Sequence, residues 1–122
     1  MTPQGAVAQF IDELESKGGL RGTDIANITD VSKATVSRWR SGSAKPQPTN
    51  ELRISDLHYI VGRLQEHYSG DEIRTWLHAR HPQLDGARAI DLIHANRTDE
   101  VLQVLNRLEA MARKPWAVIT SG

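Results

Sequence analysis

Cysteine is absent from the 122-residue chain, so it offers no disulfide, thiolate metal site or cysteine nucleophile. Long apolar runs are also missing: none approaches the ~18 residues of a membrane-spanning helix, and the N-terminus lacks signal-peptide features. The length allows one compact domain or two small modules. We therefore expect a soluble, cytoplasmic protein that is not an enzyme and has no cofactor and no membrane partner.

Neither sign of charge is in excess, because 15 basic and 15 acidic side chains give a formal net charge of zero. Phosphate binding needs clustered Lys and Arg, so this average argues against a nucleic-acid partner. The distribution is uneven, however. Residues 31–50 contain four cations and no acid, whereas residues 51–122 contain nine cations and ten acids. The local charge therefore permits DNA binding by the first of these segments, although net neutrality counts against tight binding by a monomer.

Aromatic residues are few, with three Trp, two Tyr and one Phe, whereas helix-forming residues are abundant. Apolar residues recur at helical spacing and no segment has a convincing strand pattern, so we predict an all-α fold of about seven helices. Gly and two Pro make residues 41–48 a linker. Ser69 and Glu72 have the spacing of a capping box. The expected helices span residues 3–17, 22–28, 32–41, 49–68, 71–80 and 87–94, and a last one begins near residue 98.

One segment has the spacing of a helix-turn-helix. It provides a small residue in the first helix (Ala26), an apolar residue in the turn (Val31) and apolar anchors in the second helix (Val36 and Trp39), while Ser32 is placed to cap the second helix. The other residues of that helix then project outward, where hydroxyls and cations reach phosphates and base edges. The candidate DNA-binding residues are Ser32, Lys33, Thr35, Ser37, Arg38, Arg40 and Lys45.

Residues 1–48 resemble the Xre-type helix-turn-helix of phage repressors and antitoxins, including the ending Ser37–Gly42. The resemblance implies binding to double-stranded operator DNA, generally by a dimer on two half-sites. At one turn position Asp30 stands where the family usually has glycine, so we expect a backbone conformation there that Asp tolerates better than most residues. The alternative to DNA contact is that the four cations only form a solvated surface of the helix.

The C-terminal half carries Trp76-Leu77, the turn Pro82–Gly86, the Asp-Leu segment Ala89–Ile93 and the apolar segment Glu100–Leu108. In this order they resemble the C-terminal domain of the Xre/MbcA/ParS antitoxins. The resemblance implies a helical toxin-binding or dimerisation domain over residues 49–113. It also implies that the chain is the antitoxin of a type II system, which neutralises a RES-domain toxin that consumes NAD and represses its own operon. The protein would then be a homodimer or a toxin-antitoxin hetero-oligomer.

The segment 114–122 combines charge with apolar residues and shows no helical period. The family resemblance implies that such a C-terminal tail enters or covers the active-site cleft of the toxin. The alternative is that Trp116 packs back onto its own last helix. The candidate toxin-binding residues are Arg113, Lys114, Trp116, Val118 and Ile119.

Other interpretations have less support. A stand-alone transcriptional regulator or phage repressor would use residues 50–112 for dimerisation alone, and a small enzyme has no support. His78, His81 and His94 lack a carboxylate at matching helical spacing, so we predict no metal site. Asp91 is expected to pair within its own helix. Trp39, Tyr59 and Trp76 are expected to belong to the core.

Overall fold

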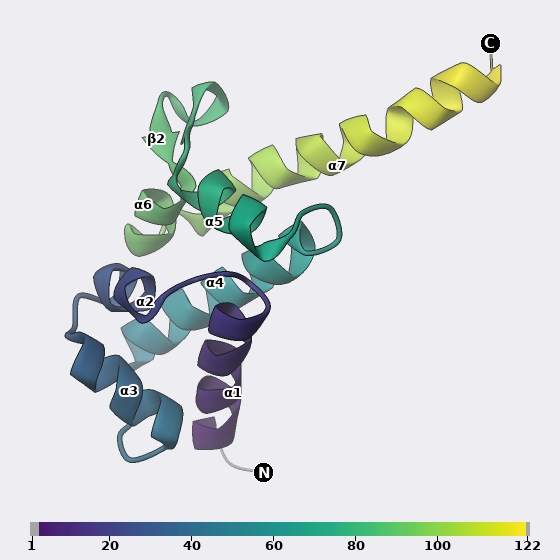
Figure 1. The fold of residues 1–122 in the computed structure, drawn as a ribbon. Coiled ribbons are helices and arrows are strands. Elements are labelled where there is room, and N and C mark those ends of the chain that lie inside the picture. Colours follow the sequence, from purple (N-terminus) through teal and green to yellow (C-terminus); the bar gives the residue numbers. More distant parts are fainter. Residues whose placement is uncertain (1–2, 122) are drawn as a thin grey trace.

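The computed structural model describes the backbone of residues 3–121 and the side chains of residues 6–111. Within these ranges the fold is all-α, as predicted, with seven α-helices, one 3₁₀ helix and one pair of very short strands (Figure 1). In chain order the elements are α1 (Pro3–Ser16), α2 (Gly22–Thr29), α3 (Lys33–Ser41), α4 (Pro48–Leu64), α5 (Gly70–His78), β1 (Arg80–His81), η1 (Pro82–Leu84), β2 (Ala87–Arg88), α6 (Ala89–His94) and α7 (Thr98–Ser121).

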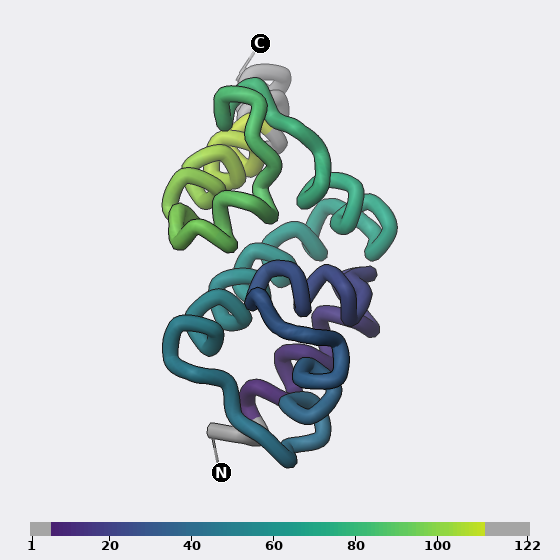
Figure 2. Tube along the Cα trace, turned by 90° about the vertical axis from the view of Figure 1, so that its left-hand side faces the viewer, coloured from purple at the N-terminus to yellow at the C-terminus, as the bar shows by residue number. Residues whose placement is uncertain are grey.

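The long helix α4 connects the two halves of the molecule. It packs against α1 and α2 on one side and against α6 on the other, and Figure 2 shows it between α1–α3 and α5–α7. Its apolar stripe includes Ile54, Leu57, Ile60 and Leu64, all fully buried, at the spacing that gives one apolar helix face. One buried cluster therefore extends from α1 to α7. The linker 41–48 joins two helices that share this core.

The last helix, α7, starts on the body of the molecule and extends away from it (Figure 1). Its first residue, Thr98, is buried and donates from Oγ1 to Asp56 Oδ2 of α4 at 2.9 Å. The backbone of α7 is helical up to Ser121, so it includes most of the segment predicted to be a tail without helical period. The candidate toxin-binding residues Arg113, Lys114, Trp116, Val118 and Ile119 lie outside the residues whose side chains are described.

The predicted end of the helix before α5 was wrong. The helix expected to reach Tyr68 ends at Leu64. The next residues tighten into turns with i to i−3 hydrogen bonds, from Glu66 N to Arg63 O and from His67 N to Leu64 O. The chain has to turn here because Ser69 adopts an extended conformation as the N-cap of α5. The predicted capping box is confirmed, with Glu72 Oε1 accepting from Ser69 N at 2.8 Å.

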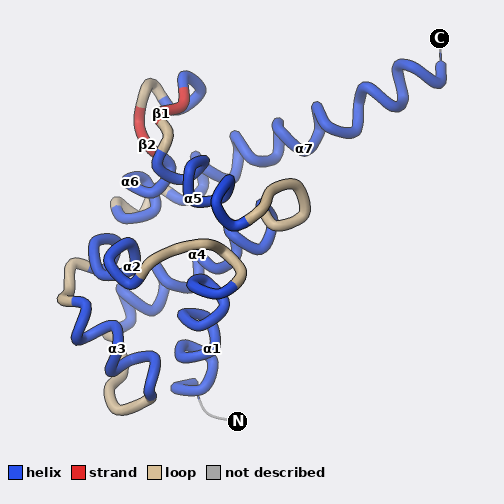
Figure 3. The backbone as a smooth tube through the Cα atoms, viewed as in Figure 1, coloured by secondary structure: helices blue, strands red, loops and turns tan. Residues whose placement is uncertain are grey.

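The prediction of no strand was wrong for one small hairpin (Figure 3). The helix expected over 71–80 ends at His78, and the helix expected from residue 87 starts at Ala89. The residues between pair instead as antiparallel β1 and β2. Pro82 disfavours a helical conformation at the residue before it, and the positive φ values of Asp85 and Gly86 reverse the chain.

Candidate functional site

Two helices, α2 and α3, joined by a short turn, span the segment that was predicted to be a helix-turn-helix. Ala26, Val36 and Trp39 are buried, and Ser32 caps α3 by accepting from Thr35 N at 3.2 Å. Asp30 adopts the left-handed conformation, with φ 60° and ψ 39°. Asp enters this region more readily than most residues, so the turn closes without a glycine at this position.

The candidate DNA-binding residues gather on α3 and the loop after it. Lys33, Ser37 and Arg38 are exposed on α3, and Lys45 is exposed in the loop. Thr35 is half-buried, with its hydroxyl 3.1 Å from Ser32 Oγ, and it accepts from Arg38 Nη2 at 3.1 Å. The exposed face of α3 therefore presents cations and hydroxyls together.

Arg40 differs from the other three cations of this segment. It forms an ion pair with Glu15 of α1, so the inference of four cations without an opposing acid was wrong at this position. Glu15 precedes Arg40 by 25 residues, and the packing of α3 on α1 brings the two together. Among the described side chains, no acidic partner within 4 Å is found for Lys33, Arg38 or Lys45.

A charged seam joins α2 to α5. Asp24 is 4% exposed and accepts from Arg74 Nε at 3.0 Å and from Arg21 N at 2.9 Å, while His78 Nε2 lies 3.2 Å from its other oxygen. Burial works to raise the pKa of Asp24, but the hydrogen bonds from Arg74 and the Arg21 backbone outweigh it and lower this pKa below its usual value. The carboxylate therefore stays ionised where it is buried.

The turn between α2 and α3 joins the same seam. The side chain of Asp30 lies 2.9 Å from His94 Nε2 of α6 and 3.8 Å from Arg53 Nη1 of α4. Arg53 also donates from Nε to the carbonyl of His94 at 3.0 Å. A polar cleft of about 440 Å³ lies along this seam between α2 and α5–α6. At its rim Asp91 pairs at 2.8 Å with Arg88, which lies in β2 just before α6 and not within the helix, and this hydrogen bond lowers the pKa of Asp91.

The three histidines considered as metal ligands point to separate partners. His78 and His94 face the two carboxylates of the seam, while His81 Nε2 lies 2.8 Å from the carbonyl of Trp76. Each ring is thus engaged by its own neighbour.

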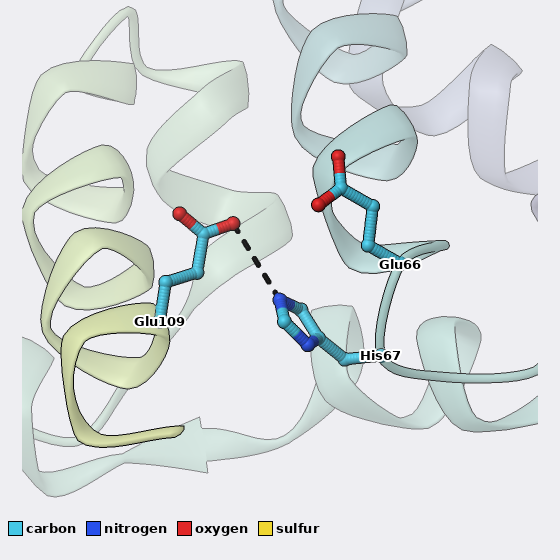
Figure 4. A group of neighbouring side chains, drawn as sticks. All are labelled: Glu66, His67 and Glu109. Atoms are coloured by element: carbon cyan, nitrogen blue, oxygen red, sulfur yellow. Dashed lines mark ion pairs between the residues drawn. The ribbon is translucent and has the colours of Figure 1, made fainter. Parts of the chain in front are cut away.

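In the described part of the chain, Glu66, His67 and Glu109 form the one group with the spacing of metal ligands (Figure 4). His67 Nε2 lies 3.6 Å from Glu109. Arg63, however, binds both oxygens of Glu109, and this hydrogen bonding lowers the pKa of Glu109 and raises that of Arg63. The Arg63 guanidinium already neutralises the carboxylate that a cation would need, so Glu109 serves in an ion pair with Arg63 that joins α7 to α4.

Two of the three aromatic residues expected in the core are not fully buried. Tyr59 is 53% exposed, and its hydroxyl accepts from Arg63 Nη1 at 3.1 Å. Trp76 is half-buried, whereas Trp39 is buried as predicted. Among the described residues, no helix is both long and apolar enough to cross a membrane.

Known proteins match this chain over both halves. The family model described as the antitoxin Xre/MbcA/ParS C-terminal toxin-binding domain matches residues 63–111. The mycobacterial cidal antitoxin MbcA of Mycobacterium bovis is 31% identical over 94 residues, which is 77% of this chain and 80% of that protein. The protein of the same name from Mycobacterium tuberculosis has the same identity and coverage.

A solved structure has the same architecture. The crystal structure of the M. tuberculosis MbcT-MbcA toxin-antitoxin complex contains a chain that superposes with a TM-score of 0.72 at 25% identity, covering 81% of this chain and 89% of that one. The sequence comparison and the structural comparison lead to the same relatives, and both cover most of each chain. The chain belongs to the Xre/MbcA/ParS family of antitoxins.

Proposed function

We propose that this chain is the antitoxin of a type II toxin-antitoxin system, and that it neutralises a RES-domain, NAD-consuming toxin by direct binding. The observation that carries the proposal is the match to an MbcA chain solved in complex with its toxin MbcT, which covers 81% of this chain. The match of residues 63–111 to a toxin-binding domain supports it. The RES identity of the toxin rests on the family resemblance of the C-terminal half.

The test uses the product of the gene next to the one encoding this chain. Expressed alone, that protein should lower cellular NAD and stop growth, and co-expression of this chain should restore both. The two proteins should also co-purify. Absence of binding between the purified proteins would overturn the proposal and favour the alternative, a stand-alone helix-turn-helix regulator.

The C-terminal residues Arg113, Lys114, Trp116, Val118 and Ile119 are part of this proposal. Trp and Arg are enriched at interface hot spots. A chain lacking residues 114–122 should keep its fold and its DNA binding but neutralise the toxin less well. Full neutralisation by the shortened chain would remove the tail from the interface.

We propose further that the helix-turn-helix binds operator DNA and represses the chain's own operon. Support comes from three exposed cations, Lys33 and Arg38 on α3 and Lys45 in the loop after it. None of the three is paired with a described acid. Ser32 and Ser37, which are both exposed, add hydroxyls on the turn and on the helix. Because the whole chain is neutral, binding as a dimer on two half-sites would supply the affinity that one module lacks.

A gel-shift series on the chain's own promoter tests this second proposal. Arg38→Ala should weaken binding and reduce the slope of log affinity against log salt by about 1 per module. Arg40→Ala is the matched control, because the ion pair with Glu15 already holds the Arg40 guanidinium. Unchanged affinity and salt dependence in Arg38→Ala would show that α3 does not present this face to DNA.

A further inference from the structure

The surface around Trp76 is open on both sides of the indole. On one side a groove of about 370 Å³ lies between Trp76 and the start of α5, lined also by Tyr68, Thr75 and Ala79. On the other side a smaller groove of about 130 Å³ lies between Trp76 and α7, where Leu108 lines it. The half-buried indole therefore forms a ridge between two mainly apolar depressions.

The indole is held in place by the hairpin that follows α5. The rings of Trp76 and His81 lie 4.6 Å apart at a tilt of 47°, and His81 Nε2 lies 2.8 Å from the Trp76 carbonyl. A side chain fixed in this way loses little conformational entropy when a partner covers it. The ridge is therefore suited to serve as a rigid anchor.

The α7 side of this surface exposes a large apolar side chain. Met111 is 67% exposed, more than Leu52 or Tyr59, the other large exposed hydrophobics among the described residues. It lines the smaller groove together with the half-buried Leu108 and with Arg107. Trp, Met and Arg are enriched in the contact areas of protein interfaces, and a contiguous apolar patch marks an interaction surface.

We propose that the toxin docks on this surface, the Trp76 face, which comprises the two grooves and the indole between them. The proposal rests on the proposed function and specifies where on the chain the toxin binds. Every residue that lines either groove lies within residues 63–111, the segment that matches a toxin-binding domain. The polar cleft along the charged seam is not an equivalent candidate, because the described charges around it are mostly paired with each other.

A second apolar groove provides the internal comparison. It lies between α1 and α4, is lined by Phe10 and Leu52 among others, and has a volume of about 400 Å³. Leu52 is 53% exposed. All of this groove lies outside the segment that matches the toxin-binding domain, so we assign the toxin to the Trp76 face and not to this groove.

The test measures binding of the full-length chain to the purified product of the adjacent gene by calorimetry. Met111→Glu should weaken binding by about tenfold or more, since it places a charge in an apolar contact. Thr75→Arg, which fills the larger groove from an exposed position on α5, should weaken it as well. Leu52→Glu is the matched control and should leave the affinity within about twofold of the wild type.

Each outcome separates this inference from the proposed function. If the wild-type chain does not bind the adjacent gene product, the proposed function fails and the inference fails with it. If the wild type binds and both Met111→Glu and Thr75→Arg bind equally well, the inference alone is overturned. It is also overturned if Met111→Glu changes the oligomeric state in sedimentation without changing toxin affinity, because a second copy would then cover the Trp76 face. Thermal melts of each variant show whether its fold is kept.

Discussion

The two sides of α5 differ in chemistry, although the residues that mark them lie within one helical turn or less of each other. On the side facing α2, Arg74 and His78 meet the buried carboxylate of Asp24, so the charges are satisfied inside the molecule. On the other side, Trp76 stands between two open apolar grooves. A satisfied polar contact fixes the relative position of two elements, whereas an open apolar surface gains stability when a partner covers it. The first side therefore stabilises the fold, and the second is the one that we propose for recognition of the toxin.

The largest expected effect is on the charged side. Asp24→Ala removes the acceptor of Arg74 and of the Arg21 backbone N–H, and it leaves the guanidinium without its buried partner. We expect the free energy of unfolding to fall by about 2 kcal/mol, because Arg74 is partly exposed and regains some hydration. Urea denaturation measures the change. Asp12→Ala, at an exposed position of α1, is the control and should be close to neutral; equal effects would contradict a stabilising role for the seam.

The same carboxylate gives the stability a pH dependence with a definite sign. The pKa of Asp24 is lowered in the folded state, so its contribution is complete above the unfolded-state pKa of about 3.9. The contribution is lost as the pH falls below that value and through the folded-state pKa. We therefore expect the stability difference between wild type and Asp24→Asn to be constant near neutral pH and to shrink between about pH 4 and the folded-state pKa. A difference that grows on acidification would reverse the sign of this linkage.

A smaller effect is expected at the exposed end of the seam. Asp30→Gly removes the contact with His94 at 2.9 Å, but glycine also relieves a left-handed conformation that costs about 1 kcal/mol for other residues. The two contributions oppose each other, so the free energy of unfolding should change by less than about 1 kcal/mol. Asp30→Asn keeps the side-chain size but loses the charge, so it should lower the free energy of unfolding by a similarly small amount. A loss above about 2 kcal/mol in Asp30→Gly would make this exposed contact as important as the one at Asp24.

The local structure of α2, α3 and the turn between them was predictable from the sequence because its determinants are local. Ala26, Val36 and Trp39 occupy the predicted buried positions, and Asp30 has the predicted left-handed conformation. Ser32 caps α3 as expected. Each of these depends on residues within a few positions in the chain, where helical periodicity and capping chemistry apply directly.

The ion pairs between distant helices were not predictable in this way. Asp24 and Arg74 are 50 positions apart, and Arg40 is 25 positions from Glu15. Helix periodicity specifies which face of a helix is apolar, but not which charged residue of another helix lies opposite. The hairpin at Arg80–Arg88 was missed because two-residue strands are too short to show alternation. The grooves beside Trp76 depend on that hairpin, since His81 of β1 lines both of them.

The smallest expected effect on stability is at Met111 of α7, and it is the most informative about the Trp76 face. Met111 is 67% exposed on α7, so Met111→Gln removes little buried surface, and Gln retains the length and the helix propensity of Met. The free energy of unfolding should change by less than about 0.5 kcal/mol, as measured by urea denaturation beside Asp24→Ala. A loss above 1 kcal/mol would mean that Met111 stabilises the fold of its own chain. Unchanged stability together with weakened toxin binding would instead place its apolar surface in the interface with the partner, as the open grooves beside Trp76 imply.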